Sequence, residues 1–296
     1  MPKRLSEYGV HDYLRLRPLL HLVKTIGYRR TDRRYFRLPA QFGDEAAVRR
    51  SIAGRRILVT IAFNDPEVLG WQARLVRDLV AADHHLIADN SSSDAMSIDN
   101  ARIAEREACL YLRLPPNPWT GRNPSRSHGL AMNWIWRRIL KPGAPEAFGF
   151  LDADIFPTAA CDPFKPLEEH AFYGDKRWAG QRWFLWAGYC FFRYGAVARE
   201  PLDFGLDWFI GLDTGGANWQ ALYRHVDPLS LPDRPLREVA ALSDVALRDA
   251  YFEWRGDWLH EVGLAGHAAI KDRKRESARR ILAPLLDGRA RGEAAM

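Results

Sequence analysis

The chain has 296 residues, of which 47% are hydrophobic and 12% are aromatic, enough to bury a sizeable core in one large domain. Its three cysteines, Cys109, Cys161 and Cys190, form no CxxC pair, so the sequence indicates neither a disulfide scaffold nor a cysteine-zinc site. The longest apolar run, at 183–192, is about half as long as a membrane span, and no cleavable leader pattern opens the chain, so we expect a cytoplasmic protein.

Positive charge is concentrated at the N-terminus. Residues 1–56 hold 14 Lys and Arg against 5 Asp and Glu, a balance of +9, while the chain as a whole carries +6. We therefore expect a basic N-terminal extension over 1–56. Within it, residues 13–30 interleave Leu, Val and Ile with Arg and Lys, so the extension is either a solvated arm or an amphipathic helix at the inner face of the membrane. Pro18 disfavours a continuous helix, and no nucleic-acid partner is expected.

The residues after this extension alternate between strand and helix patterns. Strands are predicted at 57–63, 84–89, 110–114 and 147–154. Helices are predicted at about 66–82, 98–108 and 127–140. The first of these helices opens with Asp65 as its N-cap and Pro66 at its first position. This alternation predicts an α/β fold with a doubly wound, mainly parallel sheet.

The second half of the chain is less regular and rich in Trp, Gly and Asp. We expect one domain over 57–272, in which 57–155 bind a nucleotide and 156–272 receive a second substrate. An Arg- and Ala-rich tail is expected over 273–296.

Polar side chains follow three of the predicted strands. They are Asn64, then Asp89 with Asn90, and finally the pair Asp152 and Asp154. In a doubly wound sheet, ligands bind beyond the carboxyl ends of the strands. The chain contains neither GxGxxG nor GxxxxGK[ST], so a diphosphate bound there would need another source of positive charge. Paired carboxylates can supply it by holding Mg²⁺ or Mn²⁺.

Four segments resemble the successive blocks of family-2-type glycosyltransferases with the GT-A fold. They are VTIAFN at 59–64, ADNSSSD at 88–94, SHGLAMN at 127–133 and FLDAD at 150–154. Their order and spacing both fit, over about a third of the chain. The resemblance implies a GT-A-type sheet, a UDP- or GDP-linked sugar as donor, and a sugar, glycan, lipid-linked or small-molecule acceptor.

The resemblance also implies roles for individual residues. Asp89 would contact the nucleobase, and Arg126 and His128 would lie near the nucleotide. Asp154 would hold Mn²⁺ or Mg²⁺ on the diphosphate, with Asp152 nearer the ribose or the metal. The remaining nucleotide-sugar candidates in the first two blocks are Thr60, Asn64 and Asn90.

Roles in the second half rest on weaker patterns. An inverting transferase needs a carboxylate that accepts the proton of the acceptor hydroxyl, and Asp213, before a Gly pair, is the first candidate for this base. Asp244 is its rival. His260, ahead of His267, is the candidate for a third metal ligand, and one imidazole would favour Mn²⁺ over Mg²⁺.

Other functions compete with a glycosyltransferase. A haloacid-dehalogenase-type phosphatase also places DxD after a strand, but it wants Thr or Val where this chain has Phe156. A degenerate transferase, or a module that binds membrane or nucleic acid through the basic extension, is the alternative without enzyme activity.

Overall fold

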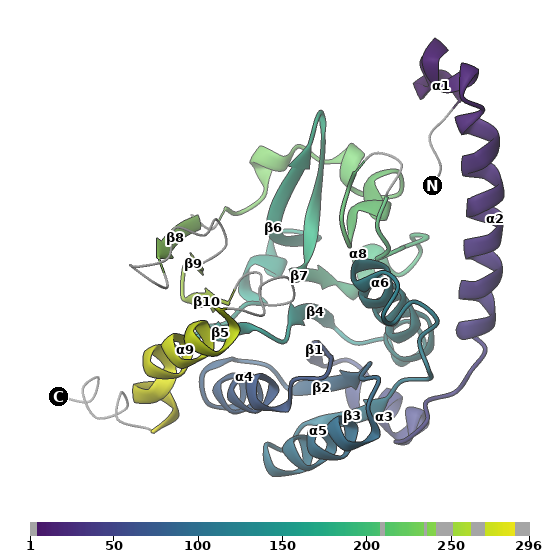
Figure 1. Ribbon diagram of the computed structural model, residues 1–296. Helices are drawn as coiled ribbons and strands as arrows, with labels where there is room; N and C mark the ends of the chain where they lie inside the picture. The colour runs from purple at the N-terminus through teal and green to yellow at the C-terminus, as the bar shows by residue number, and fades with distance from the viewer. Residues whose placement is uncertain (1–4, 208–210, 234–235, 241–250, 262–269, 288–296) are drawn as a thin grey trace.

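The computed structural model describes residues 5–207, 211–233, 236–240, 251–261 and 270–287 (Figure 1). Its larger sheet is built from β1 (Arg56–Ala62), β2 (His84–Asp89), β3 (Leu110–Arg113), β4 (Ala147–Asp152), β6 (Phe172–Ala179) and β7 (Arg182–Arg193). Its smaller sheet is built from β5 (Ile155–Pro157), β8 (Leu236–Ala240), β9 (Tyr251–Arg255) and β10 (Trp258–His260).

The helices precede, cover and follow these strands. They are α1 (Val10–Leu14), α2 (Arg17–Tyr35), α3 (Glu45–Ile52), α4 (Pro66–Leu79), α5 (Asp94–Arg106), α6 (Pro124–Ile135), α7 (Lys141–Gly143), α8 (Tyr194–Val197) and α9 (Lys271–Leu286). A π-helical turn, Trp136–Leu140, joins α6 to α7. Short 3-10 turns occur at Leu5–Glu7, Lys165–Glu168, Gly216–Trp219, Tyr223–His225 and Pro228–Ser230.

The larger sheet has the strand order β3-β2-β1-β4-β7-β6, and the smaller one has the order β5-β10-β9-β8. The first four strands of the larger sheet are parallel to one another, whereas β7 is antiparallel to both β4 and β6. The smaller sheet is antiparallel throughout. The protein is therefore an α/β fold with a mixed, mainly parallel sheet, as the alternation of strands and helices predicted.

Helices cover the larger sheet on both faces because its central strands are apolar on both faces. Ile57, Val59 and Ile61 of β1 join the core formed with α3 and α6. Leu58 and Ala62, which point the other way, join the clusters that α4 and α5 complete. The carboxyl ends of β1, β2 and β4 consequently open at one edge between two helical layers.

Both terminal segments belong to the folded body to a greater degree than their composition indicated. Tyr35, Val48 and Ile52, all within the expected extension, lie in the main core. Pro18 falls in the first turn of α2, where proline is tolerated, and so does not interrupt the helix. Most of the expected tail is α9, which packs on α4 with Leu282 fully buried.

The helix predicted from residue 127 begins earlier, at Pro124. The side chain of Asn123 accepts a hydrogen bond from the backbone N–H of Arg126 at 2.9 Å and caps the helix, while Pro124 occupies the first turn. The strand predicted to 154 instead ends at Asp152. Residues 153–154 turn from the larger sheet into β5 of the smaller one, so the DxD motif lies where the two sheets meet.

A chain of buried hydrogen bonds ties this turn to the interior. Thr60 Oγ1 donates to Gln72 Oε1 at 2.7 Å, so its lone pairs accept from His85 Nε2 at 2.9 Å. Gln72 Nε2 donates to the carbonyls of Asp152, at 2.5 Å, and Ile155, at 2.8 Å. In this chain, each group that accepts a hydrogen bond on one side leaves its neighbour only one way to donate the next. The turn that carries the DxD motif is thus anchored through its backbone.

This buried chain makes stability depend on pH. Burial lowers the pKa of His85 from 6.5 to about 4, so between these values the unfolded state binds the proton that the folded state excludes. The free energy of unfolding should be unaffected by His85 above pH 6.5 and should fall by about 3 kcal/mol as the pH drops to about 4. Urea unfolding over this range, compared with His85→Gln, checks it. Parallel pH profiles for the two proteins would contradict it.

Candidate functional site

Three strand ends converge at the carboxyl edge of the larger sheet. In the strand register, Ile61 of β1 stands opposite Asp152 of β4, and Ala62 stands opposite Asp89 of β2. Asp89 and Asp152 therefore end the two strands that flank β1. Both aspartates therefore end their strands at the same, carboxyl edge of the larger sheet.

Asp152 faces a histidine from the third block. His128 Nε2, on α6, lies 3.3 Å from Asp152 Oδ1, and about a quarter of each side chain is exposed. The other oxygen, Oδ2, lies against β7, where a Cβ at Gly188 would come within 2.6 Å of it. Only glycine leaves room for the carboxylate at that position. Asp152 is thus held between α6 and β7 with part of its surface open to a ligand.

Asp154 faces a second histidine, from β10. His260 Nε2 lies 3.6 Å from Asp154 Oδ1, and 31% of the Asp154 side chain remains exposed. Burial of its carboxyl raises the pKa of Asp154 to about 6; His260 opposes this rise and the Asp152 carboxylate adds to it. Asp154 therefore lies where additional positive charge would favour its ionised form.

Glu253 of β9 fixes the orientation of His260. Its Oε2 lies 3.1 Å from His260 Nδ1, and both side chains are buried. The same oxygen accepts from Arg255 Nη2 at 2.6 Å and pairs with Arg177 Nη2 at 3.4 Å. Burial alone would raise the pKa of Glu253, but the hydrogen bond from His260 and the charge of Arg255 outweigh it and lower the pKa to about 2.

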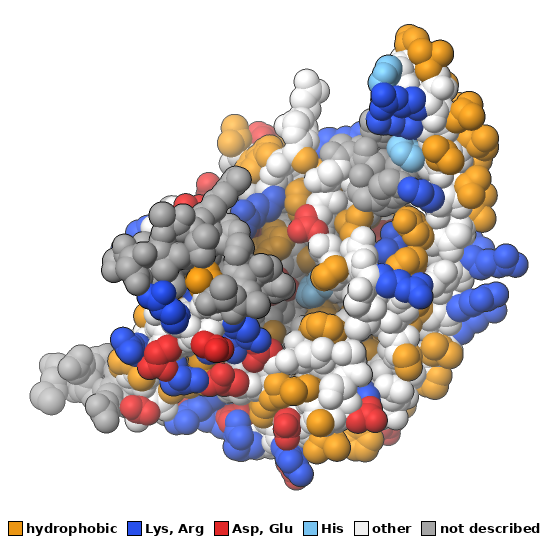
Figure 2. All heavy atoms as spheres, in the orientation of Figure 1, with side chains coloured by type: hydrophobic (Ala, Val, Ile, Leu, Met, Phe, Trp, Pro, Cys, Tyr) orange, Lys and Arg blue, Asp and Glu red, His pale blue; other side chains and the backbone are white. Residues whose placement is uncertain are grey.

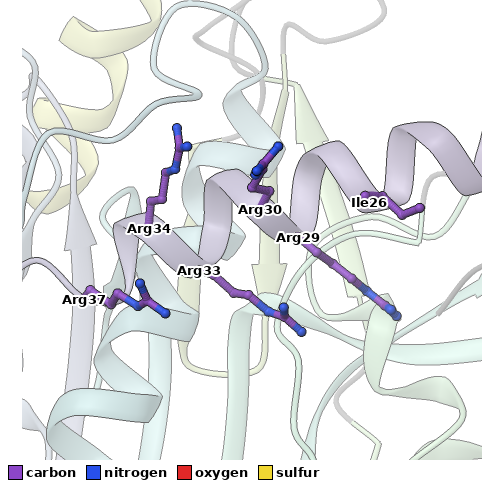
Figure 3. Close-up of a pocket in the computed structure, with 6 residues that line it drawn as sticks. All are labelled: Ile26, Arg29, Arg30, Arg33, Arg34 and Arg37. Atoms are coloured by element: carbon purple, nitrogen blue, oxygen red, sulfur yellow. The ribbon is translucent and has the colours of Figure 1, made fainter.

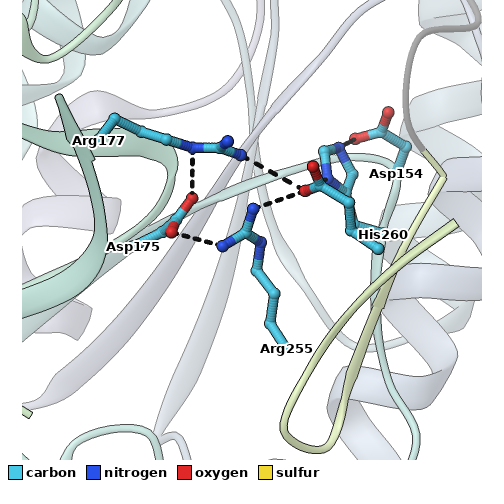
Figure 4. Close-up of polar contacts among 6 residues, drawn as sticks. Asp154, Asp175, Arg177, Arg255 and His260 are labelled. Carbon is cyan, nitrogen blue, oxygen red and sulfur yellow. Dashed lines mark hydrogen bonds and ion pairs between the residues drawn. The ribbon is translucent and has the colours of Figure 1, made fainter. Parts of the chain in front are cut away.

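The two arginines also share a second carboxylate, Asp175 of β6, whose Oδ2 lies 2.8 Å from Arg177 Nε (Figure 4). Each strand carries an acid and an arginine two residues apart, which places both charges on one face. The resulting network joins β6 of the larger sheet to β9 of the smaller sheet.

The hydrogen bond to Glu253 determines which ring nitrogen of His260 points toward Asp154. An ionised Glu253 accepts the proton on Nδ1, so Nε2 directs either a second proton or a lone pair at the carboxylate. A lone pair and a carboxylate oxygen repel each other unless a cation lies between them. A carboxylate that orients a histidine in this way is the usual support for a metal ligand.

The side chains do not form a complete metal site by themselves. Within the described ranges, no group of three or more His, Cys, Asp or Glu side chains is placed to hold a metal ion. The three predicted ligands do not face one another as a set: Asp154 pairs with His260, whereas Asp152 pairs with His128, a residue predicted to lie near the nucleotide. A cation bound here would need further ligands from a substrate or from water.

A second acidic group lies behind Asp154. The backbone N–H of Glu261 donates to the Asp154 carbonyl at 3.0 Å, and its fully buried carboxylate pairs with Arg275 of α9 at 3.3 Å. Burial raises the pKa of Glu261 to about 7, although Arg275 opposes the rise. Arg275 also binds both oxygens of Asp65, the cap of α4, at 3.0 Å. The expected tail therefore contributes a cation next to the DxD turn.

Sequence reasoning missed several residues around this site. They are Gly188, Glu253, Arg255, Glu261 and Arg275. The acid-x-Arg spacing in β6 and β9 was the one available signal, since it predicts opposite charges on one face of each strand.

Thr60 and Asp89, two predicted nucleotide contacts, are buried and already hydrogen-bonded within the protein. Thr60 is fully buried and its hydroxyl is bound by Gln72 and His85, so it cannot reach a ligand in this structure. Asp89 is 1% exposed, and its carboxylate accepts from Ser91, Asn100 and Tyr111. That carboxylate therefore braces the loop after β2 and has no free surface for a nucleobase.

Asn64 and Asn90 connect the strand ends. Asn64 exchanges two hydrogen bonds with Ser92, at 2.8 and 3.0 Å, and adopts a positive φ of 49° that asparagine tolerates well. Asn90 donates to Ser127 Oγ at 3.1 Å and accepts from Asn117, which links β2 to the first turn of α6. Asn90 is buried, whereas Asn64 remains partly exposed.

Arg126 is occupied by the N-terminal segment. Its guanidinium lies 3.7 Å from the ring centroid of Tyr28 and 4.7 Å from that of Trp119. It also pairs with Asp32 of α2 at 3.2 Å, and Asp32 accepts a second hydrogen bond from Trp119 Nε1 at 3.1 Å. This side chain docks α2 against α6, and its predicted place near the nucleotide stays a prediction.

Of the two candidate bases, Asp213 lies among the described residues and Asp244 does not. Asp213 is exposed, in a loop whose next residue, Thr214, donates to the Ser125 carbonyl at 3.1 Å beside the first turn of α6. The loop thus packs on the helix that carries His128. Asp244 and His267 lie outside the described residues.

The chain matches no model of a known protein family and none of the curated proteins with which it was compared.

Proposed function

We propose that this protein is a metal-dependent, inverting glycosyltransferase with a GT-A arrangement, which transfers a sugar from a nucleotide-diphosphate donor to an acceptor. The observation that carries the proposal is the position of the DxD motif. Asp152 and Asp154 lie at the carboxyl edge of a mainly parallel sheet, each facing one histidine, where the larger sheet turns into the smaller one.

The donor set fits a divalent cation that is completed by substrate. Asp154 offers carboxylate oxygen, and His260 offers one nitrogen already oriented by Glu253. One imidazole among oxygen ligands favours Mn²⁺ over Mg²⁺. Such a cation would neutralise the charge that develops on the departing diphosphate. Because the described residues provide no third ligand for this pair, the oxygens of the diphosphate would supply the remaining bonds, which makes metal binding depend on the nucleotide.

The remaining side chains would contact either the nucleotide-sugar donor or the sugar acceptor. Asp152 and His128, both partly exposed, would bind the ribose side of the donor. The ring of Trp186 lies tilted against that of His260, with 4.8 Å between the ring centroids, and would offer an aromatic surface next to the cation. Asp213, exposed on the loop that packs on α6, would accept the proton of the acceptor hydroxyl as it attacks the sugar.

The first test is nucleotide-sugar turnover. UDP- and GDP-linked sugars are incubated with the protein and Mn²⁺, and release of the nucleoside diphosphate is measured. Asp154→Ala should reduce the rate by about 100-fold or more, because the metal-bound diphosphate loses its anchor. Asp99→Ala, an exposed carboxylate on α5, is the matched control and should leave the rate unchanged. Equal rates for Asp154→Ala and the unaltered protein would refute the proposed site.

Glu253→Gln tests the orientation of the metal ligand. Removing the charge of Glu253 while keeping its shape should lower Mn²⁺ affinity in the presence of UDP or GDP by about 10- to 100-fold, the usual loss when a metal ligand loses its supporting carboxylate. Electron paramagnetic resonance of free Mn²⁺ measures this directly. Glu238→Gln is the matched control, since Glu238 stands opposite Glu253 in the register but is exposed. An equal loss in both variants, or in neither, would contradict the role of Glu253.

Asp213→Asn separates the base from donor binding. Loss of a general base should lower transfer to an acceptor by roughly 100- to 10,000-fold while leaving the affinity for the nucleotide and Mn²⁺ intact. The comparison uses the donor and acceptor found in the turnover screen. Normal transfer by Asp213→Asn would exclude Asp213 as the base.

A further inference from the structure

One face of α2 exposes apolar side chains to solvent. We call this the outer face of α2, and its apolar members are Leu19, Leu20, Leu22, Val23 and Ile26. Each of them is between 52% and 59% exposed. Figure 1 shows α2 at the edge of the molecule, away from the sheet, and the exposure of these side chains means that no described element covers this face.

The side of α2 that faces the body is polar instead. The less exposed positions recur with helical spacing and are His21, Thr25, Tyr28, Asp32 and Tyr35. Tyr28 and Asp32 make the contacts with Trp119 and Arg126 that dock the helix. A helix on the surface of a water-soluble domain normally points its apolar stripe inward. In α2 this polarity is inverted, which indicates that the outer face meets an apolar environment.

Arginines continue the outer face toward the C-terminal end of α2. Together with Ile26 they line a surface hollow of about 460 Å³ (Figure 3), and they are Arg29, Arg30, Arg33, Arg34 and Arg37. No ion pair joins any of the five to a carboxylate in the part of the chain that the structure describes. Positions three and four residues apart on a helix are neighbours, so these like charges repel one another. An anionic surface would relieve that repulsion.

The apolar surface extends beyond α2 toward the N-terminus. Val10 and Leu14 of α1 and Leu16 of the connecting turn are 79%, 77% and 63% exposed. Figure 2 shows hydrophobic side chains along this end of the molecule and Lys and Arg side chains next to them. Among the described helices none combines the length and the apolarity needed to span a bilayer. The arrangement therefore fits a segment that lies on a membrane surface.

We propose that the outer face of α2 docks the protein on an anionic phospholipid membrane, with its leucine-rich half in the acyl boundary and its arginines on the lipid phosphates. A helix that lies in the interface buries its apolar face about 5–10 Å deep and gains from basic residues beside anionic headgroups. The proposal rests on α2 and the residues next to it in the chain, and it does not depend on the glycosyltransferase site.

Other occupants fit this face less well. A nucleic acid would pair with the arginines but would leave five large apolar side chains in water. A second copy packed in antiparallel fashion would set the arginines of one helix against the leucines of the other and bury unpaired charge. A lipid surface alone offers an apolar layer and a phosphate layer side by side.

The experiment is co-sedimentation of the full chain with vesicles, either of phosphatidylcholine alone or of equimolar phosphatidylcholine and phosphatidylglycerol. Binding is expected only to the anionic vesicles and should weaken as salt is added. Arg30→Gln/Arg34→Gln should lower the partition coefficient by about 30-fold, at about 1 kcal/mol for each basic residue. Val23→Gln/Ile26→Gln should lower it by roughly tenfold, because the inserted surface becomes polar.

Two matched control variants make equal changes elsewhere on the surface. Arg102→Gln/Arg280→Gln removes the same charge, and Ile98→Gln/Leu229→Gln removes exposed apolar side chains. Both should bind anionic vesicles like the unaltered protein, and circular dichroism should show all variants folded. The proposal is overturned if anionic vesicles do not bind the protein, or if control and test pairs lose binding equally. It is also overturned if the outer face instead supports duplex DNA binding or self-association without vesicle binding.

Discussion

The geometry of the candidate site depends on the interactions of one buried carboxylate, that of Glu253. Its Oε2 receives Arg255, Arg177 and His260, so one oxygen links the face of β9 to β6 and to β10. A carboxylate that serves two guanidinium groups stays ionised, and it therefore holds the imidazole with Nδ1 toward itself and Nε2 toward Asp154. Without this oxygen, the smaller sheet would lose both its charge balance and the orientation of its one described histidine in the site.

The DxD turn is constrained from the other side by neutral groups. Gln72 holds two backbone carbonyls of the turn, and its own position is set by Thr60 and His85 deep in the sheet. The backbone is thus fixed by hydrogen bonds while the carboxylates stay available, which is the arrangement expected of a preorganised site. A rigid turn between two sheets also explains why Asp152 and Asp154, one residue apart, face different histidines.

The N-terminal segment gives Arg126 a structural task and α2 an unusual polarity. Arg126 lies in the third sequence block, near the predicted nucleotide, yet its guanidinium stacks on Tyr28 and Trp119 and pairs with Asp32. The strongest polar contacts of α2 are therefore directed inward, and its aliphatic side chains are left outside. A sequence pattern of alternating basic and apolar residues cannot distinguish this helix from one packed in the usual orientation, because only the docking partner selects the buried face.

Local pattern determined the strands and helices of the first half, since apolar periodicity, the cap at Asp65 and the proline after it act within a few residues. It also placed Asp89 and Asp152 at one edge, because parallel strands bring their carboxyl ends together. The exposure and the partner of each polar group were decided only by tertiary structure. The sequence predicts that three residues bind a ligand: Thr60, Asp89 and Arg126. In the folded protein their side chains hydrogen-bond to other residues, up to 94 positions away in the chain. Glu253 and Arg275 come to the site from distant segments of the chain. Tertiary structure decides their positions too, because a charge is buried only where the fold supplies its counter-charge.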